Sequence, residues 1–223
     1  MIPIRNRKKT LKVTVEEMRN FAFAYVEKYA PSKQQLKTYL LKKYLKTSIP
    51  NVKKQDVSNL IDIVLSDLEK NRFINDKFYS ESKARSMIQR GNSINKIRNY
   101  LVGKGIQDEF IKETVNKIKD DNSDQDFYSA IKVCKKKRIG PARTEDNRPL
   151  FYKKDISLLA RNGFDFETSK KVMDIDKDDY LKIINLLWFF LVLFNQIINL
   201  VFYIVSYKHK YQQSKNRYWY NYY

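Results

Sequence analysis

The chain has 223 residues with only 5 glycines and 5 prolines, too few for the turns of a fold with many short strands, so its composition predicts an all-α protein. Its single cysteine excludes an internal disulfide bond. A formal net charge of +19 indicates an acidic partner, such as nucleic acid or an anionic surface, although abundant lysine can also be solvated surface.

The first predicted helix runs from Val15 to Tyr29, where apolar residues recur at steps of three and four. It follows a basic segment, 1–14, and Pro31 ends it. Ser32 and Gln35 have the spacing of a capping box, which predicts the start of a second helix. We expect the inner face of that helix to carry Leu36, Leu40 and Tyr44.

A third helix follows, and it has the clearest helical spacing in the chain. Its apolar stripe consists of Val57, Leu60, Ile61, Val64, Leu65 and Leu68. Three helices therefore make one predicted unit, residues 15–71.

The second helix of this unit has a copy 61 residues further on, so the chain contains internal repeats. Ser32 matches Ser93, and the pair Tyr39 and Leu40 matches Tyr100 and Leu101. A third, weaker copy is Leu159 to Phe164. Repeats of this length are typical of supersecondary units that bury their apolar faces against one another.

The second predicted unit, residues 72–121, begins where Asn75 or Asp76 caps a helix that Gly91 ends. Ser93 caps the next helix, and Gly105 is a typical left-handed stop for it. The third helix of this unit carries an inner stripe of Phe110, Ile111, Thr114, Val115 and Ile118.

The third predicted unit, residues 122–180, begins within a polar linker that runs from Asp120 to Asp126. Its first helix carries Phe127, Ala130, Ile131 and Cys134. We expect the basic stretch from Lys135 to Pro149 to interrupt the unit, and Ile156 to Gly163 to resume it helically. Asp155 stands where a repeat would place an apolar residue, and Asp165 is expected to cap the last helix.

The tail, residues 181–223, departs from the repeat pattern. Residues 186–205 are mostly apolar and uncharged, long enough for a helix that crosses a bilayer. The polar side chains of Asn195, Gln196 and Asn199 would make that crossing costlier. Two other interpretations of this apolar segment are a helix that packs on the repeats and an unnatural extension, such as one from a shifted reading frame.

The residues that most catalytic and metal sites require are scarce. His209 is the one histidine and lies in the tail, so no Ser/His/Asp arrangement or histidine-containing metal cluster can form in the repeats. Cys134 falls at helical spacing from Phe127 and Ile131, which favours a core residue over a reactive thiol. We expect no catalytic residues, metal or cofactor.

The positive features are cations on the polar faces of the second and third units, which could neutralise phosphates or pair with carboxylates. For any single cation, solvated surface is the simpler interpretation. The candidate partner- or DNA-binding residues are Arg85, Arg90, Lys96, Arg98, Lys104, Lys135, Lys136, Lys137, Arg138 and Arg143.

An ordered set of residues resembles the RecX family, the bacterial modulators of the RecA recombinase. The set comprises Phe73-Ile-Asn-Asp76, Phe78-Tyr79, Arg85, Gly91, Ile97, Leu101, Lys104-Gly-Ile106 and Leu159-Ala-Arg-Asn-Gly-Phe164. The resemblance implies three tandem three-helix repeats that form an elongated, curved body, followed here by an apolar C-terminal helix. It also implies a non-enzymatic protein that lodges in the groove of the RecA filament and inhibits its recombinase, ATPase and coprotease activities in DNA repair.

Two other functions remain compatible with the sequence. One is a nonspecific DNA-binding protein driven by charge, and the other is a tail-anchored membrane protein with a helical cytoplasmic body. We expect a cytoplasmic monomer with RecA as partner and DNA as a possible contact.

Overall fold

The computed structural model describes residues 11–45 and 53–187, together with 189, 196, 200, 203 and 204, and every regular element in these residues is a helix. The predicted all-α class is therefore confirmed. The first three helices are α1 (Val15–Tyr29), α2 (Lys33–Leu45) and α3 (Lys54–Lys70). As predicted, the Gln35 amide N–H donates to Ser32 Oγ and the Ser32 N–H donates to Gln35 Oε1.

The next three helices are α4 (Asp76–Gln89), α5 (Ile94–Gly103) and α6 (Asp108–Asp121). Asn75 is the residue that caps α4, and Ser93 caps α5. Gly105, with φ of +70°, has the left-handed conformation that the sequence predicts after α5.

The last named elements are α7 (Gln125–Lys137), the short 3-10 helix η1 (Gly140–Ala142), α8 (Asn147–Arg161) and α9 (Phe166–Met173). Asp165 caps α9 as predicted. The expected interruption from Lys135 to Pro149 is wrong in extent, because α7 continues to Lys137 and α8 begins at Asn147. Pro149 lies in the first turn of α8, where a missing N–H breaks no helical hydrogen bond.

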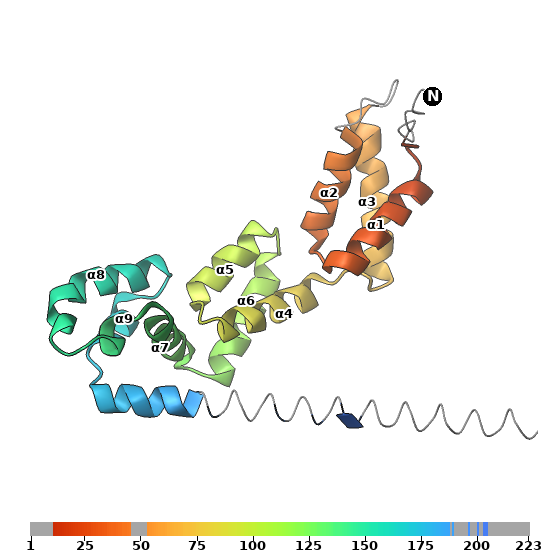
Figure 1. Ribbon diagram of the computed structural model, residues 1–223. Helices are drawn as coiled ribbons and strands as arrows, with labels where there is room; N and C mark the ends of the chain where they lie inside the picture. Colours follow the sequence, from red (N-terminus) through yellow and green to blue (C-terminus); the bar gives the residue numbers. More distant parts are fainter. Residues whose placement is uncertain are drawn as a thin grey trace, which may run out of the picture.

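The described helices bury three separate hydrophobic cores, one after another along the molecule (Figure 1). We call the three groups the first unit (α1–α3), the second unit (α4–α6) and the third unit (α7–α9). The division into separate domains at the predicted boundaries stays a prediction. Leu36, Leu40 and Tyr44 are at most 1% exposed in the first core, and Cys134 is fully buried in the third.

The third core is completed by a further helix, residues 177–187, which crosses the predicted boundary after residue 180. Because α9 has only 8 residues, it covers less of the core than α3 or α6 do in their units. Tyr180 and Ile184 of the further helix are buried in the same cluster as Cys134. The beginning of the tail is therefore packed on the third unit.

Most of the predicted apolar segment, residues 186–205, lies outside the described residues. Within the part of the chain that the structure describes, no helix is long and apolar enough to span a membrane.

Two equivalent joints connect the units. In the first joint, Ser32 Oγ donates to the carbonyl oxygen of Lys104, and the Lys33 N–H donates to Asp76 Oδ1, each at 2.8 Å. The capping serine of α2 therefore bonds to the end of α5, and the next N–H bonds to the start of α4.

In the second joint, Ser93 Oγ donates to the carbonyl oxygen of Asn162, and the Ile94 N–H donates to Asp126 Oδ1, again at 2.8 Å. The serines that the sequence aligns thus serve twice, as helix caps and as links to the next unit. Burial raises the pKa of Asp126, and the bond from Ile94 partly offsets this effect.

Candidate partner interface

The C-terminal end of α7 presents the densest group of predicted binding residues. Lys135, Lys136 and Lys137 are exposed in its last turn, and exposed Arg138 follows in the left-handed conformation with φ of +55°. The N–H groups of Arg138 and Ile139 both donate to the carbonyl oxygen of Cys134, which closes the helix. Cations near a helix C-terminus are favoured by its partial negative charge, so this cluster is tolerated without a carboxylate beside it.

Arg143, also predicted to bind a partner, is engaged inside the third unit instead. Its Nε lies 2.7 Å from Asp155 Oδ2 and its Nη2 lies 3.0 Å from Oδ1. The Gly140 N–H also donates to Asp155, and the Arg143 guanidinium lies 4.4 Å from the centre of the Phe151 ring. Arg143 therefore holds the loop between α7 and α8 to α8.

This ion pair explains the aspartate at an apolar position of the repeat. Burial by itself would raise the pKa of Asp155, but the hydrogen bonds from Arg143 and the Gly140 N–H outweigh it and hold that pKa below its usual value. Asp155 is 1% exposed and remains a carboxylate with three donors. At this position of the repeat, the third unit is therefore held together by hydrogen bonds and an ion pair. The repeat pattern places an apolar side chain there.

Two further cations of the third unit have structural contacts that the sequence did not predict. The Arg148 Nη2 donates to the carbonyl oxygens of Met173 and Ile175, at the end of α9. The Lys177 Nζ donates to the carbonyl oxygens of Pro141 and Arg143. These bonds join residues 25 to 36 positions apart, so no local sequence pattern signals them.

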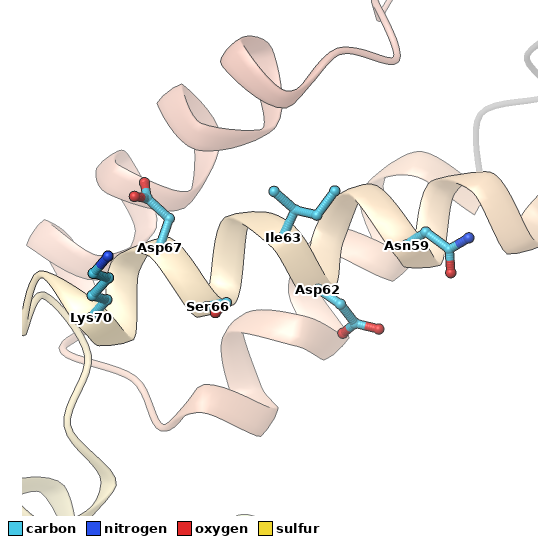
Figure 2. A pocket seen from close by; sticks show the side chains of 6 residues that line it. All are labelled: Asn59, Asp62, Ile63, Ser66, Asp67 and Lys70. Atoms are coloured by element: carbon cyan, nitrogen blue, oxygen red, sulfur yellow. The ribbon is translucent and has the colours of Figure 1, made fainter.

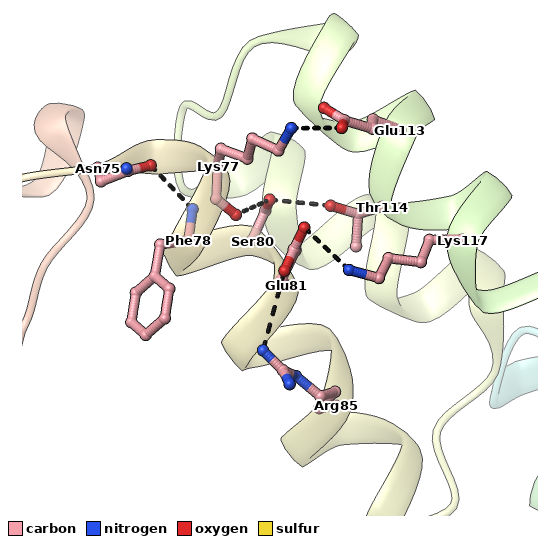
Figure 3. A network of polar contacts seen from close by, with 9 residues as sticks. All are labelled: Asn75, Lys77, Phe78, Ser80, Glu81, Arg85, Glu113, Thr114 and Lys117. Atoms are coloured by element: carbon pink, nitrogen blue, oxygen red, sulfur yellow. Dashed lines mark hydrogen bonds and ion pairs between the residues drawn. The ribbon is translucent and has the colours of Figure 1, made fainter. Parts of the chain in front are cut away.

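Arg85 lies on α4 in a polar network that joins α4 to α6 (Figure 3). Glu81 lies 3.8 Å from Arg85 and 3.4 Å from Lys117, so one carboxylate is shared by two cations. Ser80 and Thr114 hydroxyls are 2.9 Å apart beneath it. The Arg85 side chain is 69% exposed, so it stays accessible while it is oriented by Glu81.

The remaining predicted residues lie at the ends of α4 and on α5. Arg90 follows α4 and is exposed, and Arg98 is exposed on α5. Lys96 Nζ lies 3.4 Å from Asn162 Oδ1 at the second joint, and Lys104 follows α5 at the first joint. Lys96 and Lys104 are thus separated by about 12 Å along the α5 axis, each beside a different joint. Among the described residues, Arg90, Arg98 and the run from Lys135 to Arg138 have no ion-pair partner.

A different hollow, of about 550 Å³, lies on the outer face of α3 (Figure 2). Exposed Ile63 is flanked there by carboxylates, but Asp62 pairs with Lys37 and Asp67 pairs with Arg19. The mixed charge of this face distinguishes it from the basic ends of α5 and α7. Within the described ranges there is also no group of three or more His, Cys, Asp or Glu side chains that could hold a metal ion.

The chain resembles known proteins both in sequence and in fold. It is 31% identical over 176 residues to regulatory protein RecX of Myxococcus xanthus (strain DK1622), which covers 76% of this chain and 91% of that protein. It is 26% identical over 156 residues to regulatory protein RecX of Streptococcus uberis, which covers 69% of this chain and 53% of that protein. No protein-family model matches the chain.

Two solved structures share the fold. A crystal structure of regulatory protein RecX matches 72% of this chain and 74% of its own, with a TM-score of 0.52 and 19% identity. The crystal structure of RecX from Lactobacillus salivarius matches 71% of this chain and 94% of its own, with a TM-score of 0.52 and 17% identity. Because identity to the Myxococcus protein extends over nearly all of that relative, the chain belongs to the RecX family of regulatory proteins.

Proposed function

We propose that this protein binds the RecA recombinase filament and inhibits its recombinase, ATPase and coprotease activities, as a cytoplasmic monomer that modulates DNA repair and recombination. Membership of the RecX family is the observation that carries the proposal. The basic surface supports it, because a filament on DNA offers both phosphates and acidic side chains as contacts.

The proposed contact surface consists of cations of the second and third units, all of them exposed except Lys104, which is half-buried. Arg143 is left out, because its guanidinium is held by Asp155. The surface then comprises Arg85, Arg90, Lys96, Arg98, Lys104, Lys135, Lys136, Lys137 and Arg138.

The mechanism needs binding alone. Successive units with separate cores form an extended body, and such a body can span neighbouring protomers of a helical filament. A protein that bridges or blocks protomers slows the exchange of filament subunits and thereby the activities that depend on a growing filament. We therefore propose no catalytic step for this chain.

The test is RecA's ATPase on single-stranded DNA with increasing amounts of the full-length protein. The full chain is used because Ile184, which lies beyond residue 180, is buried in the third core. We expect inhibition that the combined substitution of Arg85, Arg98 and Arg138 by alanine relieves. Unchanged ATPase with excess protein would contradict the proposal.

Arg138 allows a sharper version of the test. Arg138 and Arg72 are both exposed and have φ of +55° and +61°, so glycine at either position relieves about 1 kcal/mol of backbone strain. Arg138→Gly should stabilise the fold yet weaken inhibition, whereas Arg72→Gly should stabilise it and leave inhibition unchanged. Equal inhibition by the two variants would remove Arg138 from the contact surface.

Salt separates this function from simple DNA coating. Binding through phosphates alone weakens steeply as salt rises, whereas filament binding keeps a protein-contact component. Inhibition that disappears in parallel with DNA binding, at every salt concentration, would favour a nonspecific DNA-binding protein.

A further inference from the structure

The first joint is hollowed on one side. A groove of about 360 Å³ lies between the first unit and the end of α5, where the chain passes from Gly103 to Lys104. The first unit lines it with Tyr25, Gln34, Gln35, Tyr39 and Lys42. Aromatic, amide and cationic side chains from two units therefore face one space.

Tyrosine rings lie in and beside this groove: Tyr25 and Tyr39 line it, and Tyr29 neighbours Tyr25 outside the lining. Tyr39 and Tyr25 are stacked, with ring centres 4.1 Å apart and planes 12° apart, and the Tyr29 ring lies 4.8 Å beyond Tyr25. Tyr29 is 54% exposed, which leaves part of its ring open to solvent. Across the joint, the Tyr100 hydroxyl lies 3.4 Å from the Tyr79 hydroxyl.

Lysines accompany these rings. Lys104 Nζ lies 5.2 Å from the Tyr100 ring centre and Lys28 Nζ lies 5.2 Å from that of Tyr29, while Lys42 is exposed in the groove itself. None of the described residues that line the groove carries a carboxylate. The groove is therefore cationic, and no acidic side chain of its lining neutralises it.

The second joint differs at the equivalent positions. Asn95, which aligns with Gln34, donates to the carbonyl oxygen of Gly163, and Lys96, which aligns with Gln35, reaches Asn162. These side chains span the second joint. At the first joint Gln35 instead completes the cap of its own helix, and the space beside it is the groove.

We propose that the groove of the first joint binds single-stranded nucleic acid. Rows of aromatic side chains bind unpaired bases by stacking, and lysines along such a row neutralise the phosphates between the bases. A duplex keeps its bases stacked on one another, so it can use the lysines but not the ring of Tyr29. An acidic polypeptide would likewise use the lysines alone.

The experiment measures binding of a fluorescent oligodeoxythymidine, about 20 nucleotides long so that it exceeds a single site, to the full chain by anisotropy. Two variants remove the proposed contacts: Lys42→Ala with Lys104→Ala, and Tyr29→Leu. The control for the lysine variant is Lys54→Ala with Lys70→Ala on α3. The control for Tyr29→Leu is Phe166→Leu, which removes another exposed aromatic ring, 67% exposed.

We expect the double lysine variant and Tyr29→Leu each to weaken binding about tenfold and the controls to change it little. The double lysine variant should also reduce the slope of log affinity against log salt by about 1.4, the value for two lost phosphate contacts on a single strand. Tyr29→Leu should weaken binding of the single strand but not of a duplex of equal length.

Two results would overturn the proposal. One is an equal loss of affinity in the groove variants and the controls, because it would reduce the binding to net charge. The other is displacement of the oligonucleotide by polyglutamate as readily as by unlabelled oligodeoxythymidine. The assay contains no RecA, so its outcome does not depend on whether the chain regulates the filament.

Discussion

At the scale of single residues, glycines decide how closely the units approach. A Cβ atom added to Gly105 would lie 2.5 Å from Gln34 Cβ, and one added to Gly163 would lie 2.5 Å from Ser93 Oγ. Both residues follow the second helix of a unit and face the joint with the preceding unit. The repeated Gly in the sequence therefore serves the joint as well as the end of the helix.

Gly105→Ala should destabilise the protein by about 2 kcal/mol, because the new methyl group collides with Gln34 and the left-handed backbone disfavours a side chain. Gly103→Ala is the control, since a Cβ there meets nothing within 4 Å. Alanine at this helical position should be neutral or stabilise by up to about 1 kcal/mol. Urea unfolding of both variants measures the difference, and equal midpoints would refute the predicted collision.

The buried Asp155 carries a second prediction at this scale. Asp155→Asn should destabilise the third unit by about 3 kcal/mol, because it leaves the Arg143 guanidinium without its carboxylate. Arg143→Met combined with Asp155→Leu should cost less than Asp155→Asn alone, since no unpaired charge remains. Thermal unfolding followed by circular dichroism compares the stability of the variants. A double variant that is less stable than Asp155→Asn would contradict this account.

The same carboxylate predicts a pH dependence. The pKa of Asp155 is lower in the folded than in the unfolded protein, so its stabilisation is complete above the unfolded value of about 3.9. Stability should therefore decline as pH falls from there through the folded pKa. In urea unfolding across this range, Asp155→Asn should show a shallower decline than the unchanged protein, and parallel curves would exclude Asp155 as the cause.

At the scale of elements, the helix of residues 177–187 covers the part of the third core that the short helix α9 leaves open. Burial raises the pKa of the Cys134 thiol to about 12, and Tyr180 and Ile184 belong to the cluster that buries it. Because this is the one cysteine of the chain, its reactivity reports whether that helix is docked.

Ile184→Asp should undock the helix, because it places a charge in the third core, and should destabilise that unit by about 3 kcal/mol or more. The rate at which a thiol reagent labels Cys134 should then rise strongly at constant pH. Asn185→Asp adds the same charge at the exposed neighbouring position and should leave the rate unchanged. Equal labelling of the two variants would mean that this helix does not protect the core.

The elements also show which helix properties are local. The caps formed by Ser32, Ser93 and Asp165 follow from short patterns, and the structure confirms them. The start of α8 was predicted too late, at Ile156, because its first turns are polar and basic and contain Pro149. Their helical conformation is supported by bonds such as those of Arg148 to the end of α9, which no local pattern encodes.

At the scale of the whole molecule, the two joints set how successive units are arranged. Ser32→Ala with Asp76→Ala removes both joint bonds between the first and second units. It also removes the bond by which Ser32 caps α2, but it changes no side chain of the hydrophobic cores. Small-angle X-ray scattering should then show a larger radius of gyration and a broader distance distribution, because the first unit is less restrained.

The control for this prediction is Ser80→Ala with Asp108→Ala. It also removes a buried hydroxyl and a first-turn aspartate, but both lie inside the second unit. This variant should lose some stability while its scattering profile stays unchanged. The same broadening in both variants would show that the joint bonds do not control the arrangement.

The sequence by itself determined the helical class, the ends of most helices and the inward faces of the first two units, because caps and apolar stripes act between residues within a few positions of one another. It also identified the family, since the motifs that carry the resemblance are local. Tertiary structure alone decided which cations are accessible. Arg143 is engaged by Asp155, whereas Arg138 is exposed, and no spacing distinguishes these two members of one basic stretch. The joints likewise connect residues as far as 72 positions apart, such as Ser32 and Lys104, and such partners meet only when the units fold against each other.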